Sequence, residues 1–181
     1  MRTPLHLALI YGSARPGRLC DAVGSWAEAE IRRAGGFTTE VTDPRTALDD
    51  EPALREALTR ADGFVVVTPE YNHSFAAPLK ALIDAADVEW GAKPAAFVSY
   101  GGLSGGLRAV EQLRLVFAEL HVVGVAESVA LPDAWNRFDG AGRMLEPERP
   151  RRAMGRMLGR LRWWGEALKA ARSAEIFTEA A

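Results

Sequence analysis

The sequence is organised by short apolar segments, each followed by a longer stretch of helical pattern. Three of them, 5–11, 63–68 and 95–100, are rich in β-branched or aromatic residues and lack the polar alternation of a half-exposed strand. Segments of this kind are typical of strands that are covered on both faces. Residues 37–42 and 122–131 add two more strands. The chain therefore predicts a five-stranded parallel sheet of the α/β class with right-handed crossovers.

Helical patterns fill the intervals between these strands. Four helices are expected there, at 17–34, 51–60, 75–86 and 105–120. A last helix is expected at about 151–172, and residues 132–150 before it form a long irregular connection. The last helix carries an apolar stripe that should dock on the sheet: Met154, Met157, Leu158, Leu161, Trp164 and Leu168.

Composition limits the classes of protein to which the chain can belong. Its 181 residues, 48% of them hydrophobic, suffice for one substantial core, which predicts a single domain over 1–181. The net charge of -2 argues against nucleic-acid binding. The single cysteine, Cys20, excludes an internal disulfide and a cysteine-based metal site, and it suits the reducing cytoplasm. Since no segment approaches the roughly 20 apolar residues of a membrane span, membrane insertion is not expected.

The loops that follow the first, third and fourth strands should face one site. In an open parallel sheet the ligand crevice lies beyond the carboxyl ends of the strands, and each of these three loops has an unusual composition. They are therefore the candidate functional residues of the chain.

The loop after the first strand, 12–18, leads into a helix whose first N–H groups are unpaired and whose dipole end is positive. Ser13 offers a hydroxyl, and Arg15 and Arg18 offer charge, to a phosphate group. A nucleotide-triphosphate loop is discounted because Arg18 stands where that motif requires Lys, and the dinucleotide fingerprint fails because Ala14 replaces its second glycine. A phosphate site is predicted, with an ordinary strand-to-helix turn as the alternative.

The loop after the third strand, 68–74, places a proline, an acid, an aromatic residue and amide or hydroxyl donors at a strand end. A planar heterocycle fits against such a loop, with its edge paired to backbone groups. The alternative is a polar turn whose Tyr71 packs outward. Ser74 is expected to cap the next helix under both interpretations, and His73 is expected to line the pocket.

The loop after the fourth strand, 99–106, has four glycines in its last six residues, which permit positive φ and a close approach of backbone N–H groups to a ligand. Residues 102–106 also match the nucleophile-elbow pattern of hydrolases, with Ser104 as the nucleophile. The only later histidine, His121, lies at the far end of the helix that Ser104 precedes, on the order of 25 Å away. Ser104 is therefore expected to be a helix cap or a ligand donor.

Taken together, the motifs of the three loops resemble the NADPH-dependent FMN reductase family over about residues 5–130. The resemblance rests on Gly-Ser-x-Arg after the first strand, on Pro-Glu-Tyr-Asn-His-Ser with Leu79-Lys80 and Ile83-Asp84 behind it, and on Tyr-Gly-Gly…Gly-Gly after the fourth strand. Two positions depart from the family pattern. Pro16-Gly17 stands where small polar residues often bind phosphate, and Ala81 stands where an Asn is common.

The resemblance implies a flavodoxin-like three-layer sandwich with strand order 2-1-3-4-5 and helices on both faces. It implies that the FMN phosphate binds in the first loop and the isoalloxazine ring between the other two. The cofactor-binding residues would then be Gly12, Ser13, Arg15, Arg18, Pro69, Glu70, Tyr71, Asn72, His73, Ser99, Gly101 and Gly102. It also implies a homodimer or homotetramer in which the flavin lies near a subunit boundary and the helix with Lys80 and Asp84 makes contact across it. The i, i+4 spacing of these two residues equally suits an intrahelical surface pair.

The activity implied by the resemblance is hydride transfer from NADPH, or from NADH, through bound FMN to a quinone, flavin, azo compound or similar small acceptor. Because this is the chemistry of the cofactors themselves, no catalytic acid or base and no metal is expected. Two alternatives stay open: a flavodoxin-type electron carrier and a flavin-free binding module. Trp135 and Phe138, in the long late connection, either cover the flavin or pack beneath their own loop.

Overall fold

A computed structural model describes residues 3–175 and 177 of the chain. Its centre is a five-stranded sheet in the order β2-β1-β3-β4-β5, in which all neighbouring strands pair in parallel. The strands are β1 (Leu5–Tyr11), β2 (Phe37–Thr42), β3 (Gly63–Pro69), β4 (Pro94–Tyr100) and β5 (Val123–Leu131). The predicted strands and their order, that of flavodoxin-like doubly wound sheets, are confirmed.

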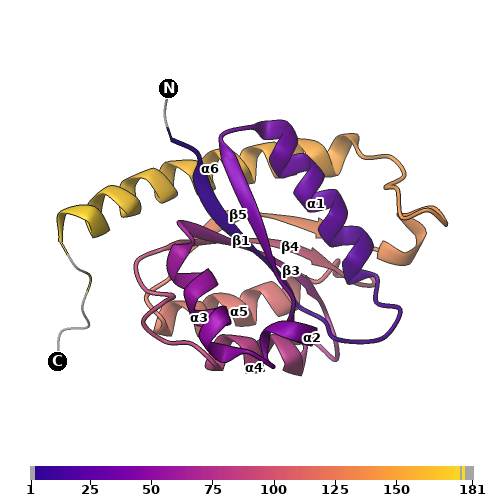
Figure 1. The fold of residues 1–181 in the computed structure, drawn as a ribbon. Helices are drawn as coiled ribbons and strands as arrows, with labels where there is room; N and C mark the ends of the chain where they lie inside the picture. Colours follow the sequence, from indigo (N-terminus) through magenta and orange to yellow (C-terminus); the bar gives the residue numbers. More distant parts are fainter. Residues whose placement is uncertain (1–2, 176, 178–181) are drawn as a thin grey trace.

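Helices cover both faces of the sheet and give three layers (Figure 1). On one face lie α1 (Cys20–Ala34) and α6 (Glu148–Ala174). On the other lie α3 (Glu51–Arg60), α4 (Ala77–Asp84) and α5 (Leu107–Glu119). Successive residues of the inner strands point to opposite sides, so that Leu9 packs under α1 and α6 while Ile10 packs under the other helices. Burial on both faces explains why these strands lack polar alternation.

The structure adds two short helices that were not predicted and moves the start of others. Asp43 caps the short helix α2 (Pro44–Ala47), and a 3-10 helix, η1 (Ala134–Asn136), lies within the expected irregular connection. The start of α1 falls three residues later than expected, because Gly17 before it has a positive φ of 61°. In the same way, Gly105 and Gly106 are left-handed and delay the start of α5.

The apolar stripe of α6 was only partly predicted. Met154, Met157, Leu158 and Leu161 are buried as expected. Trp164, by contrast, is 37% exposed and Leu168 is only partly buried. Gly165 takes the inward position instead, because a Cβ there would lie 2.7 Å from Leu5 Cδ1. The second half of this helix therefore approaches β1 too closely for a large side chain, and the prediction that Trp164 lies in the core was wrong.

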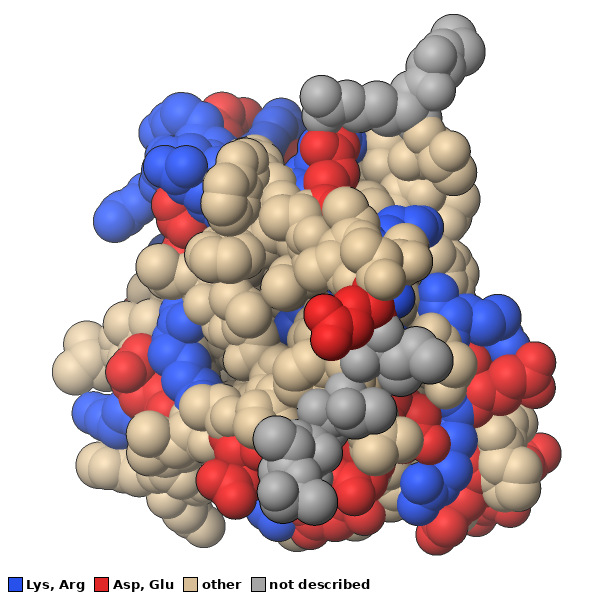
Figure 2. Space-filling model, turned by 90° about the vertical axis from the view of Figure 1, so that its left-hand side faces the viewer, with Lys and Arg blue, Asp and Glu red and all other residues tan. Residues whose placement is uncertain are grey.

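Charges are mixed on the side of the molecule drawn in Figure 2, where Lys and Arg lie among Asp and Glu around a largely uncharged centre. Lys80 and Asp84 form an exposed ion pair within α4, with 2.6 Å between Nζ and Oδ2. Among residues 3–175 and 177, every helix is either too short or too polar to cross a lipid bilayer.

Candidate functional site

The three loops expected to share a site surround one cavity of about 620 Å³ at the carboxyl edge of the sheet. Pro69, Glu70 and Tyr71 line it from β3, Gly101 and Gly102 from β4, and residues between 17 and 22 from the first loop and α1. The volume falls in the range of roughly 300–1,000 Å³ that is usual for small-molecule sites. The cavity also lies beside the point where the strand order reverses, between β1 and β3, where doubly wound sheets bind their ligands.

Six of the twelve sequence-predicted site residues line this cavity: Arg18, Pro69, Glu70, Tyr71, Gly101 and Gly102. The other six lie outside its lining. Ser13 and Arg15 contact Tyr71, and Asn72 and His73 are exposed at a turn. The Gly12 amide donates to the Val67 carbonyl at 2.7 Å, and Ser99 Oγ donates to the Gly105 carbonyl at 2.8 Å. The expectation that His73 lines the pocket is therefore not met in this structure.

Tyr71 connects the first loop to the second. Its hydroxyl lies 3.1 Å from Ser13 Oγ, and the guanidinium carbon of Arg15 lies 3.8 Å from the centre of its ring. Close packing behind this contact requires glycine at position 12, where a Cβ would come within 2.9 Å of the backbone of Val67 and Thr68. The exposed Arg15 side chain thus stacks on an aromatic face and has no carboxylate partner among the described residues.

Arg18 is buried and holds the first loop to neighbouring segments. Its Nη1 donates to Asp43 Oδ1 at 2.8 Å, its Nε donates to Asp21 Oδ1 at 2.8 Å, and its guanidinium also contacts the Ser13 carbonyl. The hydrogen bonds to Asp43 raise the pKa of Arg18. Burial alone would raise the pKa of Asp43, but the bonds from Arg18 outweigh it and the pKa is lowered. Most of the charge of Arg18 is therefore matched within the protein.

Arg45 also binds the first loop, which the sequence analysis did not predict. Arg45 lies in α2, and its side chain donates hydrogen bonds to the carbonyl oxygens of Ala14 and Arg15 in the first loop. The sequence did contain one signal for its position: Asp43 followed by Pro44 is typical of a helix start, and the Asp43 carboxylate accepts from the Arg45 amide.

The second loop makes a two-residue turn at Asn72 and His73, whose φ angles are 50° and 68°. Backbone hydrogen bonds join Tyr71 and Ser74 across it in both directions. Both central residues are left-handed, which is the conformation of a type I′ turn and which Asn adopts more readily than most residues. The predicted helix cap at Ser74 was wrong, because its hydroxyl donates to Gln112 Oε1 of α5 at 2.6 Å.

Glu70 joins the second loop to the third. Its carboxylate accepts from Ser104 Oγ at 2.7 Å, from the Arg108 amide at 3.1 Å and from Arg108 Nη1 at 2.7 Å. Burial of this side chain, which is 8% exposed, opposes its ionisation, but these hydrogen bonds are stronger and lower the pKa. The Ser104 hydroxyl donates to Glu70 and accepts from the Gly106 amide. Because both of these bonds hold Ser104 in the loop, the interpretation of residues 102–106 as a nucleophile elbow fails.

Two aromatic residues complete the lining of the cavity. The hydroxyl of Tyr100 is buried and has no hydrogen-bond partner among the described residues, and burial beside Cys20 raises its pKa. Trp135, from η1, is 62% exposed and stands over Gly102, where an added Cβ would lie 3.5 Å from its ring. Phe138, by contrast, packs against the core under α1 and α6. Of the two aromatic residues in the late connection, only Trp135 reaches the cavity.

Comparison with known proteins links this arrangement to one family. A family model described as NADPH-dependent FMN reductase matches residues 5–136. The chain is 33% identical over 147 residues to an NAD(P)H-dependent FMN reductase of Schizosaccharomyces pombe, which covers 70% of this chain and 73% of the relative. It is also 38% identical over 102 residues to a probable NADPH:quinone oxidoreductase of Oryza sativa, covering 53% of this chain and 52% of that relative, about half its length.

The fold has counterparts among solved structures. The flavoenzyme NAD(P)H:(acceptor) oxidoreductase FerB of Paracoccus denitrificans superposes with a TM-score of 0.66 over 90% of this chain and 98% of its own. The two sequences are 19% identical. This similarity shows the shared fold.

Proposed function

Since this chain belongs to the NADPH-dependent FMN reductase family, we propose that it binds FMN between the three loops, accepts a hydride from a reduced nicotinamide dinucleotide and passes the electrons to a small acceptor. The observation that carries this proposal is the meeting of all three loops around one cavity of about 620 Å³. The names of the relatives suggest a quinone or a flavin as the acceptor. Azo compounds are further candidates.

The residues around the cavity fit a flavin mononucleotide. The buried Tyr100 hydroxyl has an unused hydrogen-bonding capacity, and the glycines at 101 and 102 leave room for a flat ring under Trp135. Arg15 offers the phosphate a guanidinium that no carboxylate of the described chain neutralises. We assign the ring to residues 69–71 and 101–102, and the phosphate to the loop from Gly12 to Arg18.

When bound, FMN supplies the redox chemistry, since its ring accepts a hydride and gives electrons up again. The protein positions the reactants. Glu70 fixes the second loop to the third, so the backbone N–H groups of the third loop are held in place before negative charge develops on a reduced ring. Trp135 limits access of water from one side. No described group of three or more His, Cys, Asp or Glu residues is placed to hold a metal ion.

The test is the visible spectrum of the protein saturated with FMN, recorded without oxygen before and after NADPH is added. Loss of the flavin bands within seconds is the expected result, and a later addition of quinone should restore them. Flavin that binds but stays oxidised would instead indicate an electron carrier. Failure to bind flavin would overturn the site assignment. Because donor and acceptor would use the same open side of the ring in turn, parallel double-reciprocal lines are expected in steady-state kinetics.

Two properties of the working protein belong to the same proposal. We expect a homodimer or homotetramer, which light scattering on the purified protein would measure. We also expect a cytoplasmic location, because Cys20 is a buried free thiol and suits a reducing compartment.

A further inference from the structure

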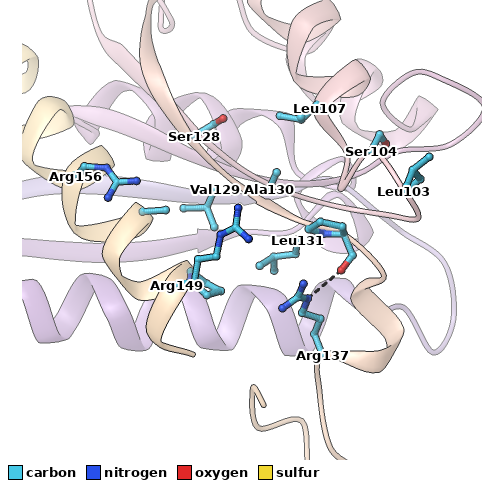
Figure 3. Close-up of a pocket in the computed structure, with 13 residues that line it drawn as sticks. Leu103, Ser104, Leu107, Ser128, Val129, Ala130, Leu131, Arg137, Arg149 and Arg156 are labelled. Atoms are coloured by element: carbon cyan, nitrogen blue, oxygen red, sulfur yellow. Dashed lines mark hydrogen bonds between the residues drawn. The ribbon is translucent and has the colours of Figure 1, made fainter. Parts of the chain in front are cut away.

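A second cavity, of about 430 Å³, lies between the outer edge of β5 and the first turns of α6. Three arginines line it: Arg137 from the connection after η1, and Arg149 and Arg156 from α6. Figure 3 shows the side chains of Arg137 and Arg149 converging on the space beside Leu131, with Arg156 entering from the next turns of the helix. No other part of the predicted function uses these residues.

The positive charge of this cavity is only partly balanced by the protein. Its lining contains no acidic residue, and within the described chain none of the three arginines forms an ion pair. Arg137 Nε donates to the Pro132 carbonyl at 3.0 Å, which fixes the direction of its guanidinium. Glu127, an acidic residue of β5, is paired with Arg160 at 3.1 Å, and the charge of Arg156 contributes to lowering its pKa without forming an ion pair. Arg137 also borders a hollow lined by Asp133 and Glu146, without an ion pair to either.

The second cavity shares a wall with the first. Residues 101 and 102 line the first cavity, and Leu103 and Ser104 line the second. Backbone hydrogen bonds tie this loop to the connection after β5, from Asp133 N to Gly102 O and from Ala134 N to Gly101 O, both at 3.1 Å. On that connection, Trp135 lines the first cavity and Arg137 the second. The two cavities therefore lie side by side, and an extended ligand can reach from the first into the second.

We propose that the second cavity binds the phosphate groups of the nicotinamide dinucleotide whose nicotinamide ring reacts in the first cavity. The inference rests on the proposed function. Guanidinium groups bind phosphate oxygens through paired, charge-assisted hydrogen bonds, and the positive end of the α6 dipole adds to the attraction. The exposed Leu103 and the buried Val129 supply apolar surface beside the arginines. A neutral quinone would gain little from three unpaired cations, which favours the dinucleotide as the occupant.

The test uses FMN-loaded, oxidised protein and titration calorimetry with NADP⁺ and NAD⁺, which bind without reacting. The double substitution R149A/R156A should weaken NADP⁺ binding by about tenfold or more, since each change removes charge-assisted hydrogen bonds. Loss confined to NADP⁺ would identify the 2′-phosphate as the bound group, and equal loss for NAD⁺ would identify the pyrophosphate. The matched control is R152A, an exposed arginine of the same helix outside the lining, which should leave both affinities unchanged.

A second measurement separates this inference from the proposed function. Reduced nicotinamide riboside carries the reacting ring but no phosphate group, so the double variant should bleach with it at the wild-type rate while needing a higher concentration of NADPH. Unchanged NADP⁺ affinity in the double variant, or an equal loss in R152A or with the phosphate-free riboside, would overturn the inference. If the wild-type flavin stayed oxidised with both donors, the proposed function would fail, and the calorimetry would still decide whether the arginines bind phosphate.

Discussion

The two ends of the same sheet are built in different ways. At the amino end, Asp62 accepts from the His6 amide at 2.9 Å and from Lys169 Nζ of α6 at 2.7 Å. Lys93, 5% exposed, donates to the carbonyl oxygens of Leu58 and Thr59. At the carboxyl end, by contrast, the loops hold one another by polar contacts around an open cavity. At the first end the charged groups are bonded within the fold, whereas the second end also leaves the Arg15 guanidinium without a carboxylate partner and the Tyr100 hydroxyl without a hydrogen bond among the described residues.

The difference shows how one fold separates stability from function. Burial lowers the pKa of Lys93 to about 8, so holding this ammonium inside the protein weakens folding at neutral pH, and its two carbonyl bonds offset part of that effect. The charged groups at the cavity are either paired between loops or exposed, so no ammonium there has to be buried in the way that Lys93 is. Substitutions at the amino end should therefore change stability alone, and substitutions at the carboxyl end should change flavin binding as well.

The largest effect is expected from G106A. Gly106 has a φ of 89°, and a Cβ there would lie 2.7 Å from Ser99 Cβ and 2.8 Å from the Tyr100 amide. Backbone strain and overpacking together should lower the free energy of unfolding by about 3 kcal/mol or more. Urea denaturation measures this loss, and FMN affinity should fall with it. The matched control is G35A, where φ is 68° and ψ is 164° but nothing lies within 4 Å of the added Cβ, so only backbone strain of about 1–3 kcal/mol remains and FMN affinity should not change.

Glu70→Gln should cost about 2 kcal/mol and should also weaken FMN binding. The change removes a buried carboxylate that accepts three hydrogen bonds and leaves its donors poorly satisfied. Because the pKa of Glu70 is lowered from 4.5, the carboxylate stabilises the fold fully above about pH 4.5. The difference in unfolding free energy between wild type and E70Q should shrink as pH falls below that value. A difference that stays constant down to pH 3 would contradict this account.

Asp62→Asn is the counterpart at the other end of the sheet. Its carboxylate is also mostly buried and binds Lys169, so we expect a loss of about 1–2 kcal/mol in unfolding free energy. FMN affinity should not change, because the site lies at the opposite edge. If D62N weakened flavin binding as much as E70Q, the proposed separation between the two ends would be wrong.

Much of this fold could be predicted from the sequence because strands buried on both faces carry a strong apolar signal. The three loops could be placed together for a related reason, since the carboxyl ends of parallel strands share one edge. The direction of individual side chains could not be predicted from the sequence. The sequence predicts Arg18 as a phosphate ligand, but it did not show that Asp43, 25 residues away, binds the same guanidinium. The sequence predicts Glu70 as a flavin contact, but it did not show that the carboxylate also binds Ser104 and Arg108 from another loop.

The smallest change in stability with a functional effect is expected from W135A. Trp135 is 62% exposed, so its loss should alter the free energy of unfolding by less than about 0.5 kcal/mol. If its ring covers the flavin, FMN affinity should fall by about fivefold, the effect of losing about 1 kcal/mol of aromatic stacking. Trp163, on α6 and 61% exposed, provides the control, since W163A removes the same surface away from the cavity. Flavin fluorescence titration measures both affinities. Equal values for W135A, W163A and wild type would show that Trp135 only borders the cavity, and that its binding surface is made by the loops alone.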